Sequence, residues 1–283
     1  MSNIKIYAFA DESDAFIDGQ IDALKRNGLN GIEIRNVDGT NVSDITVHKA
    51  KEVKDKFDSN GLSVWSIGSP IGKINIESDD FVAHIEKFKH TLEISKVLNA
   101  TNIRIFSFYI PEGRNPDIYE NEVVERLGRL LEIAKPYGVD LCHENEKGIF
   151  GDISERCLKI HKALPELKAV FDPANFVQCG QNTISAWNEL SSYVKYIHIK
   201  DSTLLGDIVP AGEGEGNVKL IAEKYIEFGG RHFTMEPHLV EFDGLKSLER
   251  EGEQSKVGKV VYKDAKTAFD YATATFKGLI GKD

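Results

Sequence analysis

Short apolar runs rich in β-branched and aromatic residues alternate with longer amphipathic runs along the whole chain. The short runs predict strands, and the longer runs, whose apolar residues recur at intervals of three and four, predict helices. Clear helical patterns cover residues 81–98 and 123–134. Eight strands are expected, at residues 4–9, 31–35, 62–67, 102–106, 139–144, 168–172, 194–199 and 232–236.

The strict alternation of strand and helix predicts an α/β fold of the (β/α)8 TIM-barrel type. Eight units in 283 residues give about 35 residues per unit, which suits this barrel. A doubly wound sheet is the alternative, but the loop after Phe9 lacks the glycines of a dinucleotide-binding turn. No linker interrupts the pattern, so residues 1–283 are expected to form a single domain. The charged segment 241–259 is expected to be a lid over the barrel mouth or a solvated surface insertion.

Composition favours a small-molecule partner over a polymer. The formal net charge is −10, which disfavours nucleic-acid binding because that binding depends on Lys and Arg. Cys142, Cys157 and Cys179 lack the C-x-x-C spacing of a zinc or redox site and fit a reducing compartment. No apolar run is long enough for a signal peptide or a membrane span. We therefore expect a cytoplasmic protein without a membrane or nucleic-acid partner.

Four consecutive predicted strands end in residues that can bind a metal. They are Glu144, Asp172, His198 and Glu236. The carboxyl ends of barrel strands converge on one mouth, so these side chains are expected to meet there. Because side chains alternate faces along a strand, the layer beneath them is expected to contain Cys142, Val170, Tyr196 and Thr234.

Three carboxylates and one imidazole in one place would repel each other unless a cation lay between them. Oxygen-rich ligation with one nitrogen suits Mn²⁺, Mg²⁺ or Co²⁺, and Zn²⁺ is a further candidate. Each residue taken singly is more often a helix cap or an ion-pair partner. Glu146, two residues beyond Glu144 on the same face, is the alternative ligand, although its place farther past the strand suits a substrate contact better.

Several of these segments carry a family resemblance. ENEKGIFGD, DPANF, HIKD followed by PAGEGEGN, and TMEPH resemble the xylose isomerase-like TIM-barrel superfamily of sugar and sugar-phosphate isomerases and epimerases. The resemblance covers essentially the whole chain. It implies a metal that binds an open-chain ketose, an enediolate intermediate, and Glu144 and Glu236 as ligands and as the acid/base pair. Asp172 and His198 would complete the ligands.

The resemblance is weaker for the substrate. Ketose epimerases of the family often have a histidine where this chain has Asn175, and an amide cannot shuttle a proton. Other candidates for substrate contacts are Glu33, Arg35, Lys73, Arg104, Tyr109, Glu146, Lys200 and His238. Each of the basic residues could instead form an ion pair at the barrel rim. If Arg35, Lys73 or Lys200 converge, a phosphorylated substrate becomes a candidate despite the acidic net charge.

The sequence also leaves other functions open. A dehydratase of the inosose type would use the same metal site. An endonuclease for abasic sites would need more histidines at the strand ends and a basic groove, and a non-catalytic sugar-binding protein would not need all four ligands.

The glycine-rich loop 210–217 lacks the Lys-Ser/Thr of a P-loop and predicts a flexible turn. A homo-oligomer is possible, but no sequence feature fixes its size.

Overall fold

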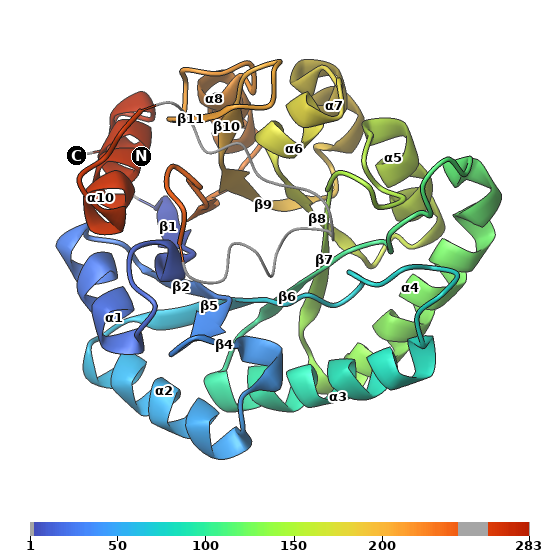
Figure 1. Ribbon diagram of the computed structural model, residues 1–283, viewed down its shortest axis with the longest axis horizontal. Coiled ribbons are helices and arrows are strands. Elements are labelled where there is room, and N and C mark those ends of the chain that lie inside the picture. The colour runs from blue at the N-terminus through green and yellow to red at the C-terminus, as the bar shows by residue number, and fades with distance from the viewer. Residues whose placement is uncertain (1–2, 243–259, 283) are drawn as a thin grey trace.

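Eight parallel strands close into a barrel with helices around it (Figure 1). The computed structural model describes residues 3–242 and 260–282. Around the barrel the strands follow the order β1-β12-β9-β8-β7-β6-β5-β2. Their bounds are β1 (Lys5–Ala8), β2 (Gly31–Ile34), β5 (Ser63–Gly68), β6 (Asn102–Ile105), β7 (Asp140–Glu144), β8 (Lys168–Phe171), β9 (Val194–Ile199) and β12 (His232–Met235). This arrangement confirms the predicted (β/α)8 barrel.

The helices lie outside the barrel, and several begin at a side chain that caps them. Their bounds are α1 (Ile17–Arg26), α2 (Val47–Ser59), α3 (Phe81–Leu98), α4 (Glu120–Ala134), α5 (Ser154–Ala163), α6 (Pro173–Gln178), α7 (Thr183–Leu190), α8 (Val218–Glu227) and α10 (Ala265–Leu279). The Asp80 carboxylate accepts hydrogen bonds from the backbone N–H groups of Val82 and Ala83 at the start of α3. Asn99 ends α3 in the left-handed conformation.

The barrel interior is packed separately from the apolar layer between the sheet and the helices. Cys142, Val170 and Tyr196 form a buried cluster of their own inside the barrel, as the alternation of faces predicts. At the opposite end from the strand tips, Trp65 stacks between Tyr7 and His232 at ring distances of 4.9 and 4.2 Å. These stacked rings fill the lower end of the barrel, so a site can open only at the mouth.

The loops after β5, β6 and β7 are joined by backbone hydrogen bonds into one wall of the mouth. Phe108 donates to Gly72 O, Ile76 donates to Tyr109 O, and Ile110 donates to Gly148 O, each at 3.0 Å. Gly72 has φ +90°, and a Cβ atom there would lie 2.0 Å from Phe106 O. Only glycine permits this close approach. We call these loops, residues 69–76, 106–110 and 145–151, the rim wall.

The last helix completes the ring next to the first. Arg26 of α1 and Asp270 of α10 form an ion pair at 2.8 Å. No helix in the described part of the chain is long and apolar enough to span a membrane. The predicted lid or insertion at 241–259 lies, except for Glu241 and Phe242, outside the described residues.

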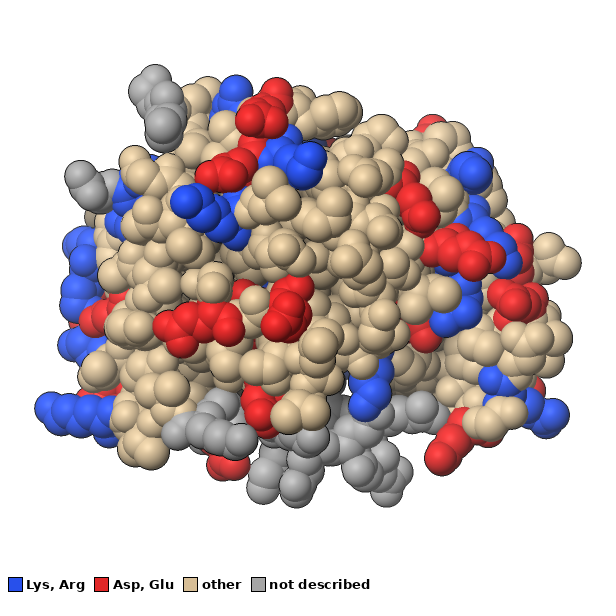
Figure 2. All heavy atoms as spheres, turned by 90° about the horizontal axis from the view of Figure 1, so that it is seen from above, with Lys and Arg blue, Asp and Glu red and all other residues tan. Residues whose placement is uncertain are grey.

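Charges of both signs are mixed on the side of the molecule seen in Figure 2. On that face the Lys and Arg side chains of the described residues lie among Asp and Glu side chains, and no continuous basic strip forms there. Cys142, Cys157 and Cys179 are free thiols, as the sequence predicts.

Candidate functional site

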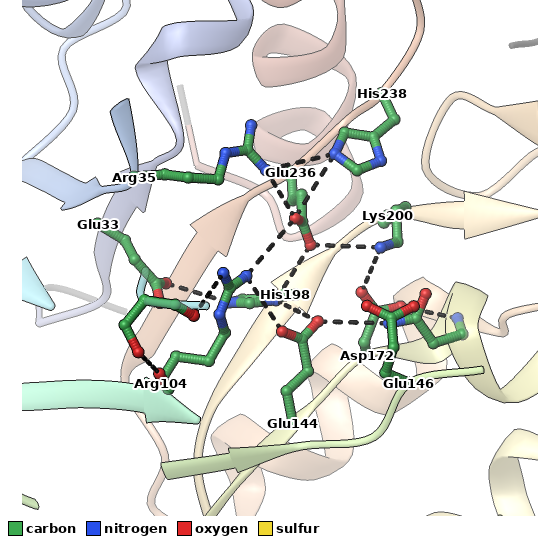
Figure 3. Close-up of polar contacts among 12 residues, drawn as sticks. Glu33, Arg35, Arg104, Glu144, Glu146, Asp172, His198, Lys200, Glu236 and His238 are labelled. Carbon is green, nitrogen blue, oxygen red and sulfur yellow. Dashed lines mark hydrogen bonds and ion pairs between the residues drawn. The ribbon is translucent and has the colours of Figure 1, made fainter. Parts of the chain in front are cut away.

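Four side chains from neighbouring strands meet at the barrel mouth (Figure 3). Glu144 is the last residue of β7, His198 is the last but one of β9, and Asp172 and Glu236 directly follow β8 and β12. All four side chains are buried, and one ligand atom from each lies within 4.8 Å of the others. The sequence analysis predicts this convergence. It extends β8 and β12 by one residue, because Asp172 and Glu236 come just after these strands.

His198 faces carboxylates with both ring nitrogens. Its Nδ1 lies 3.0 Å from Glu144 Oε1 and 3.1 Å from Glu236 Oε2. Its Nε2 lies 3.1 Å from Glu33 Oε2, and Glu33 also accepts a 2.7 Å hydrogen bond from the Tyr196 hydroxyl. Burial opposes a charged imidazole, but the carboxylates outweigh burial and raise the pKa of His198 well above its ordinary value.

Asp172 uses its two carboxylate oxygens differently. Oδ1 caps α6 by accepting from the backbone N–H of Asn175 at 2.9 Å. Oδ2 is buried and accepts no hydrogen bond, although Lys200 Nζ lies 2.9 Å away. Burial raises the pKa of Asp172 to about 7, and the nearby Glu144 and Glu236 add to the rise, against the opposing charge of Lys200. The helix-cap reading is therefore correct for one oxygen, and the other points into the group of four.

Glu144 and Glu236 are held in the ionised form. Burial acts to raise the pKa of Glu144, but His198 and Arg104 outweigh it and lower this pKa to about 2. Likewise, Lys200 and His198 outweigh burial and hold the pKa of Glu236 well below its ordinary value. Arg104 Nη1 lies 3.2 Å from Glu144 Oε2 and 4.0 Å from Glu236 Oε1. One guanidinium thus reaches both glutamates.

The donor set suits a divalent cation. Three carboxylates and one imidazole supply the mixture of hard oxygen and borderline nitrogen donors that Mn²⁺, Mg²⁺, Co²⁺ and Zn²⁺ accept. Glu144 Oε2 and Asp172 Oδ2 are buried oxygens without a hydrogen-bond donor. Each lies next to a charge of the chain, Arg104 or Lys200, and each keeps electron pairs that a divalent cation could accept. His198 Nε2 against Glu33 is the arrangement that orients a metal-binding imidazole.

Arg35 lies at the edge of the same site. Its Nη1 donates to Glu236 Oε1 at 3.1 Å, while Nε and Nη2 bind both oxygens of Asp11 at 2.9 and 3.0 Å. His238 Nε2 lies 3.5 Å from Glu236 Oε1 and 3.3 Å from Glu12 Oε1. Burial, the largest cause, and nearby cations lower the pKa of His238 well below its ordinary value, although Glu236 opposes them.

Further residues predicted to contact substrate form hydrogen bonds or ion pairs with glutamates at the mouth. Lys73 binds Glu146 Oε2 at 2.9 Å, which links two loops of the rim wall. Asn175 Nδ2 donates to Glu144 Oε1 at 3.3 Å and to Asn145 O at 2.9 Å. Lys200 also reaches Glu236 Oε2 at 3.3 Å. Arg35 and Lys200 therefore contact different oxygens of Glu236, while Lys73 forms an ion pair with Glu146.

The helical histidines are kept apart from this site. His48, His84, His90 and His161 lie in α2, α3 and α5. Among residues 3–242 and 260–282, two groups of three or more potential ligands occur, and both include Glu236 at this mouth.

A family model described as "xylose isomerase-like TIM barrel" matches residues 21–249. The chain belongs to the xylose isomerase-like TIM-barrel family. Three solved structures with this fold are similar over nearly the whole chain. The D-allulose 3-epimerase from Methylomonas sp. has a TM-score of 0.75 at 16% identity, covering 98% of both chains. The IolI protein with a bound zinc atom has a TM-score of 0.74 at 17% identity, also covering 98% of both.

A third similar structure is the probable 3-DHS dehydratase AsbF from Bacillus anthracis. Its TM-score is 0.72 at 16% identity, covering 97% of this chain and 98% of that one. At these identities the likeness extends to the fold. A comparison with curated protein sequences finds no match. A role as a sugar isomerase, epimerase or dehydratase fits the xylose isomerase-like family, and the particular reaction has to be inferred from the site.

The sequence analysis misses three residues that shape the site. Asn145 accepts from Asp172 N and donates to Asp172 O, both at 2.9 Å. The sequence does not indicate it, because alternation along the chain assigns Asn145 to the face opposite Glu144 and Glu146. Asp11 and Glu12, which contact Arg35, lie in a short 3-10 helix (Ala10–Glu12) just beyond β1. Two carboxylates at a strand end are the signal that would have identified them.

The glycine-rich loop 210–217 is organised around one carboxylate. Asp201 Oδ2 accepts from the N–H groups of Gly212 and Gly214 at 2.8 and 3.1 Å, and Oδ1 accepts from Gly216 at 2.9 Å. The amides that could have held a phosphate are occupied by this side chain. This arrangement agrees with the absence of a P-loop sequence. The expected flexible turn is instead held by hydrogen bonds to the Asp201 carboxylate.

Proposed function

We propose that this protein is a divalent-metal-dependent isomerase or epimerase of a small sugar or sugar phosphate. The observation that carries the proposal is the buried group formed by Glu144, Asp172, His198 and Glu236, whose ligand atoms lie within 4.8 Å of one another. Membership of the xylose isomerase-like family supports the same class of reaction. Of the four, Glu144, Asp172 and Glu236 would bind the ion through oxygen, and His198 would bind it through Nδ1.

A divalent cation held there would act as a Lewis acid at the carbonyl oxygen of an open-chain sugar and make the neighbouring C–H more acidic. Glu144 and Glu236, which are held in the ionised form, would remove and return that proton as carboxylates. They come from β7 and β12, which β8 and β9 separate in the barrel. The two carboxylates can therefore approach a substrate from different sides.

Other residues of the chain would position these groups. Glu33 fixes the ring of His198, and Arg104 lies near enough to both glutamates to hold their orientation. Phe9 and Phe106 are fully buried and lie under the guanidinium of Arg104, with ring centres 5.1 and 4.8 Å from Cζ. These apolar rings keep water from one side of the glutamates.

Proton exchange with solvent tests the proposal directly. The protein is incubated with Mn²⁺ in D₂O and a panel of ketoses, ketose phosphates and inososes, and NMR follows deuterium at each carbon. Deuterium at the carbon next to the carbonyl, absent when the metal is chelated, is expected. The product separates epimerisation and isomerisation from dehydration, the second reaction on the same groups. Metal binding without exchange of any substrate would instead support a sugar-binding protein.

Replacing Glu236 with Gln tests the assignment of the base. The variant keeps the shape of the side chain but cannot accept a proton, so exchange should fall by about 10²- to 10⁴-fold. Glu213→Gln is the matched control, because Glu213 is exposed and lies outside the group of four. Exchange retained in Glu236→Gln would refute its role. Exchange lost in Glu146→Gln but retained in Glu144→Gln would assign the ligand role to Glu146.

A further inference from the structure

Arg35 lies inside a second group of potential metal ligands. Glu12, Glu236 and His238 also present ligand atoms within 4.8 Å of one another. The guanidinium contacts all three. Nη1 lies 3.1 Å from Glu236 Oε1 and 3.5 Å from His238 Nε2, and Nη2 lies 3.4 Å from Glu12 Oε1. In Figure 3 the Arg35 side chain extends toward the carboxylate of Glu236 and the ring of His238.

We propose that the Arg35 guanidinium takes the place of a second metal ion, so that the centre binds one ion and Glu236 offers it one oxygen. This inference rests on the proposed function. Glu236 Oε2 faces His198 Nδ1 at 3.1 Å, within the group of four, and Oε1 faces Arg35. In two-metal sites a carboxylate of this kind can bridge the ions, with one oxygen on each. Here a fixed positive charge of the chain occupies the second position.

The surroundings of Arg35 hold it there. Asp11 binds Nε and Nη2 with both carboxylate oxygens, and the rings of Phe9 and Phe242 lie 4.4 and 4.9 Å from Cζ. A planar guanidinium satisfies this paired hydrogen bonding and ring stacking together, whereas an ammonium does not. The side chain is fully buried. Its charge would repel a second cation at close range, and its contact with Oε1 fixes the rotation of the Glu236 carboxylate.

Arg35 is thus a positioning residue, and its role can be measured without substrate. Mn²⁺ bound per chain is counted by equilibrium dialysis, and electron paramagnetic resonance reports whether two ions are coupled. The wild type is expected to bind one ion with an uncoupled signal. The double variant Arg35→Met/Asp11→Asn is expected to bind two, with a coupled signal, because Glu12, Glu236 and His238 become available. The Asp11 change avoids leaving a buried carboxylate without its partner.

Two controls complete the experiment. Arg35→Lys keeps a positive charge and should still bind one ion. Adding His238→Ala to the double variant should return the count to one, because the second group loses its imidazole. The inference is overturned if the wild type or Arg35→Lys binds two ions, if the double variant binds one, or if the second ion survives the loss of His238. A wild type that binds no Mn²⁺ would overturn the proposed function as well, so the two failures are distinct.

Discussion

At the scale of single residues, Asn145 shows how the chain aligns two neighbouring strand ends. Its side-chain amide makes paired hydrogen bonds with the backbone of Asp172, and its own carbonyl accepts from Asn175. The residue lies between Glu144 and the start of α6. It therefore sets the distance between Glu144 and Asp172 without contacting the proposed ion.

We expect Asn145→Ala to weaken Mn²⁺ binding by roughly 10- to 100-fold, the usual effect of removing a group that orients metal ligands. Titration calorimetry with Mn²⁺ measures the change. Asn182→Ala is a matched control, because Asn182 only caps α7 by accepting from Ser185 N. It should cost about 1 kcal/mol of stability and leave Mn²⁺ affinity unchanged. Equal affinities in both variants would show that Asn145 does not align the ligands.

The sequence predicts the four strand-end residues because the topology of a barrel and the two-residue period of a strand fix where Glu144, Asp172, His198 and Glu236 point. It does not predict Asn145, whose partner is the backbone of another strand. Nor does it predict which carboxylates Arg35 meets, because that choice depends on rotamers and on loops that lack periodicity. Metal binding by the four residues stays a prediction until ions are measured.

At the scale of elements, the short hairpin after β9 and the loop that follows it form one unit around Asp201. The hairpin pairs β10 (Asp201–Ser202) with β11 (Ile208–Val209). Strands of two residues carry no hydrophobic period, so the sequence analysis could not foresee them. A Cβ atom at Gly216 would lie 3.1 Å from Pro173, the first residue of α6. The loop therefore also packs against the helix that Asp172 caps.

We expect Asp201→Ala to destabilise the protein by about 2–4 kcal/mol, because four backbone N–H groups, those of Ser202, Gly212, Gly214 and Gly216, lose their acceptor in a largely buried place. Urea unfolding measures the stability, and limited proteolysis should then cut within residues 210–217. Glu213→Ala, an exposed change in the same loop, should alter neither. An Asp201→Ala protein as stable as the wild type would show that water replaces the carboxylate.

At the scale of the whole molecule, three buried histidines are kept neutral. Burial lowers the pKa of His84 to about 4, of His143 to about 3 and of His161 to about 4. Two of them make hydrogen bonds inside the fold. His84 Nε2 accepts from Gly72 N at 2.8 Å, and His143 Nε2 lies 2.9 Å from Ser107 Oγ. His84 thereby ties α3 to the rim wall.

These pKa values predict loss of stability in acid. Between about pH 6.5 and 4 the unfolded chain binds protons that the folded chain excludes, so stability falls as pH falls. Each histidine contributes up to about 1.4 kcal/mol per pH unit in this range. His84→Gln can still accept from Gly72 but does not titrate, and its slope should be smaller by that amount. Urea unfolding at pH 6 and pH 5 gives the slopes, and identical slopes would contradict the assignment.

The barrel as a whole was predictable because eight repeats of one pattern leave few alternatives. The oligomeric state and the role of segment 241–259 remain predictions, since neither involves a period or a motif.

The rim wall has an evolutionary consequence. Its three loops are joined through backbone atoms, so side chains that are only partly buried there, such as Lys73 and Glu146, can be exchanged while these hydrogen bonds keep the chain path. Substitution alone, with no insertion or deletion, can then alter the surface that a sugar meets on this side of the mouth. Descendants of this protein could acquire new substrates here while keeping the same architecture, and Gly72 is the position at which such drift would be arrested.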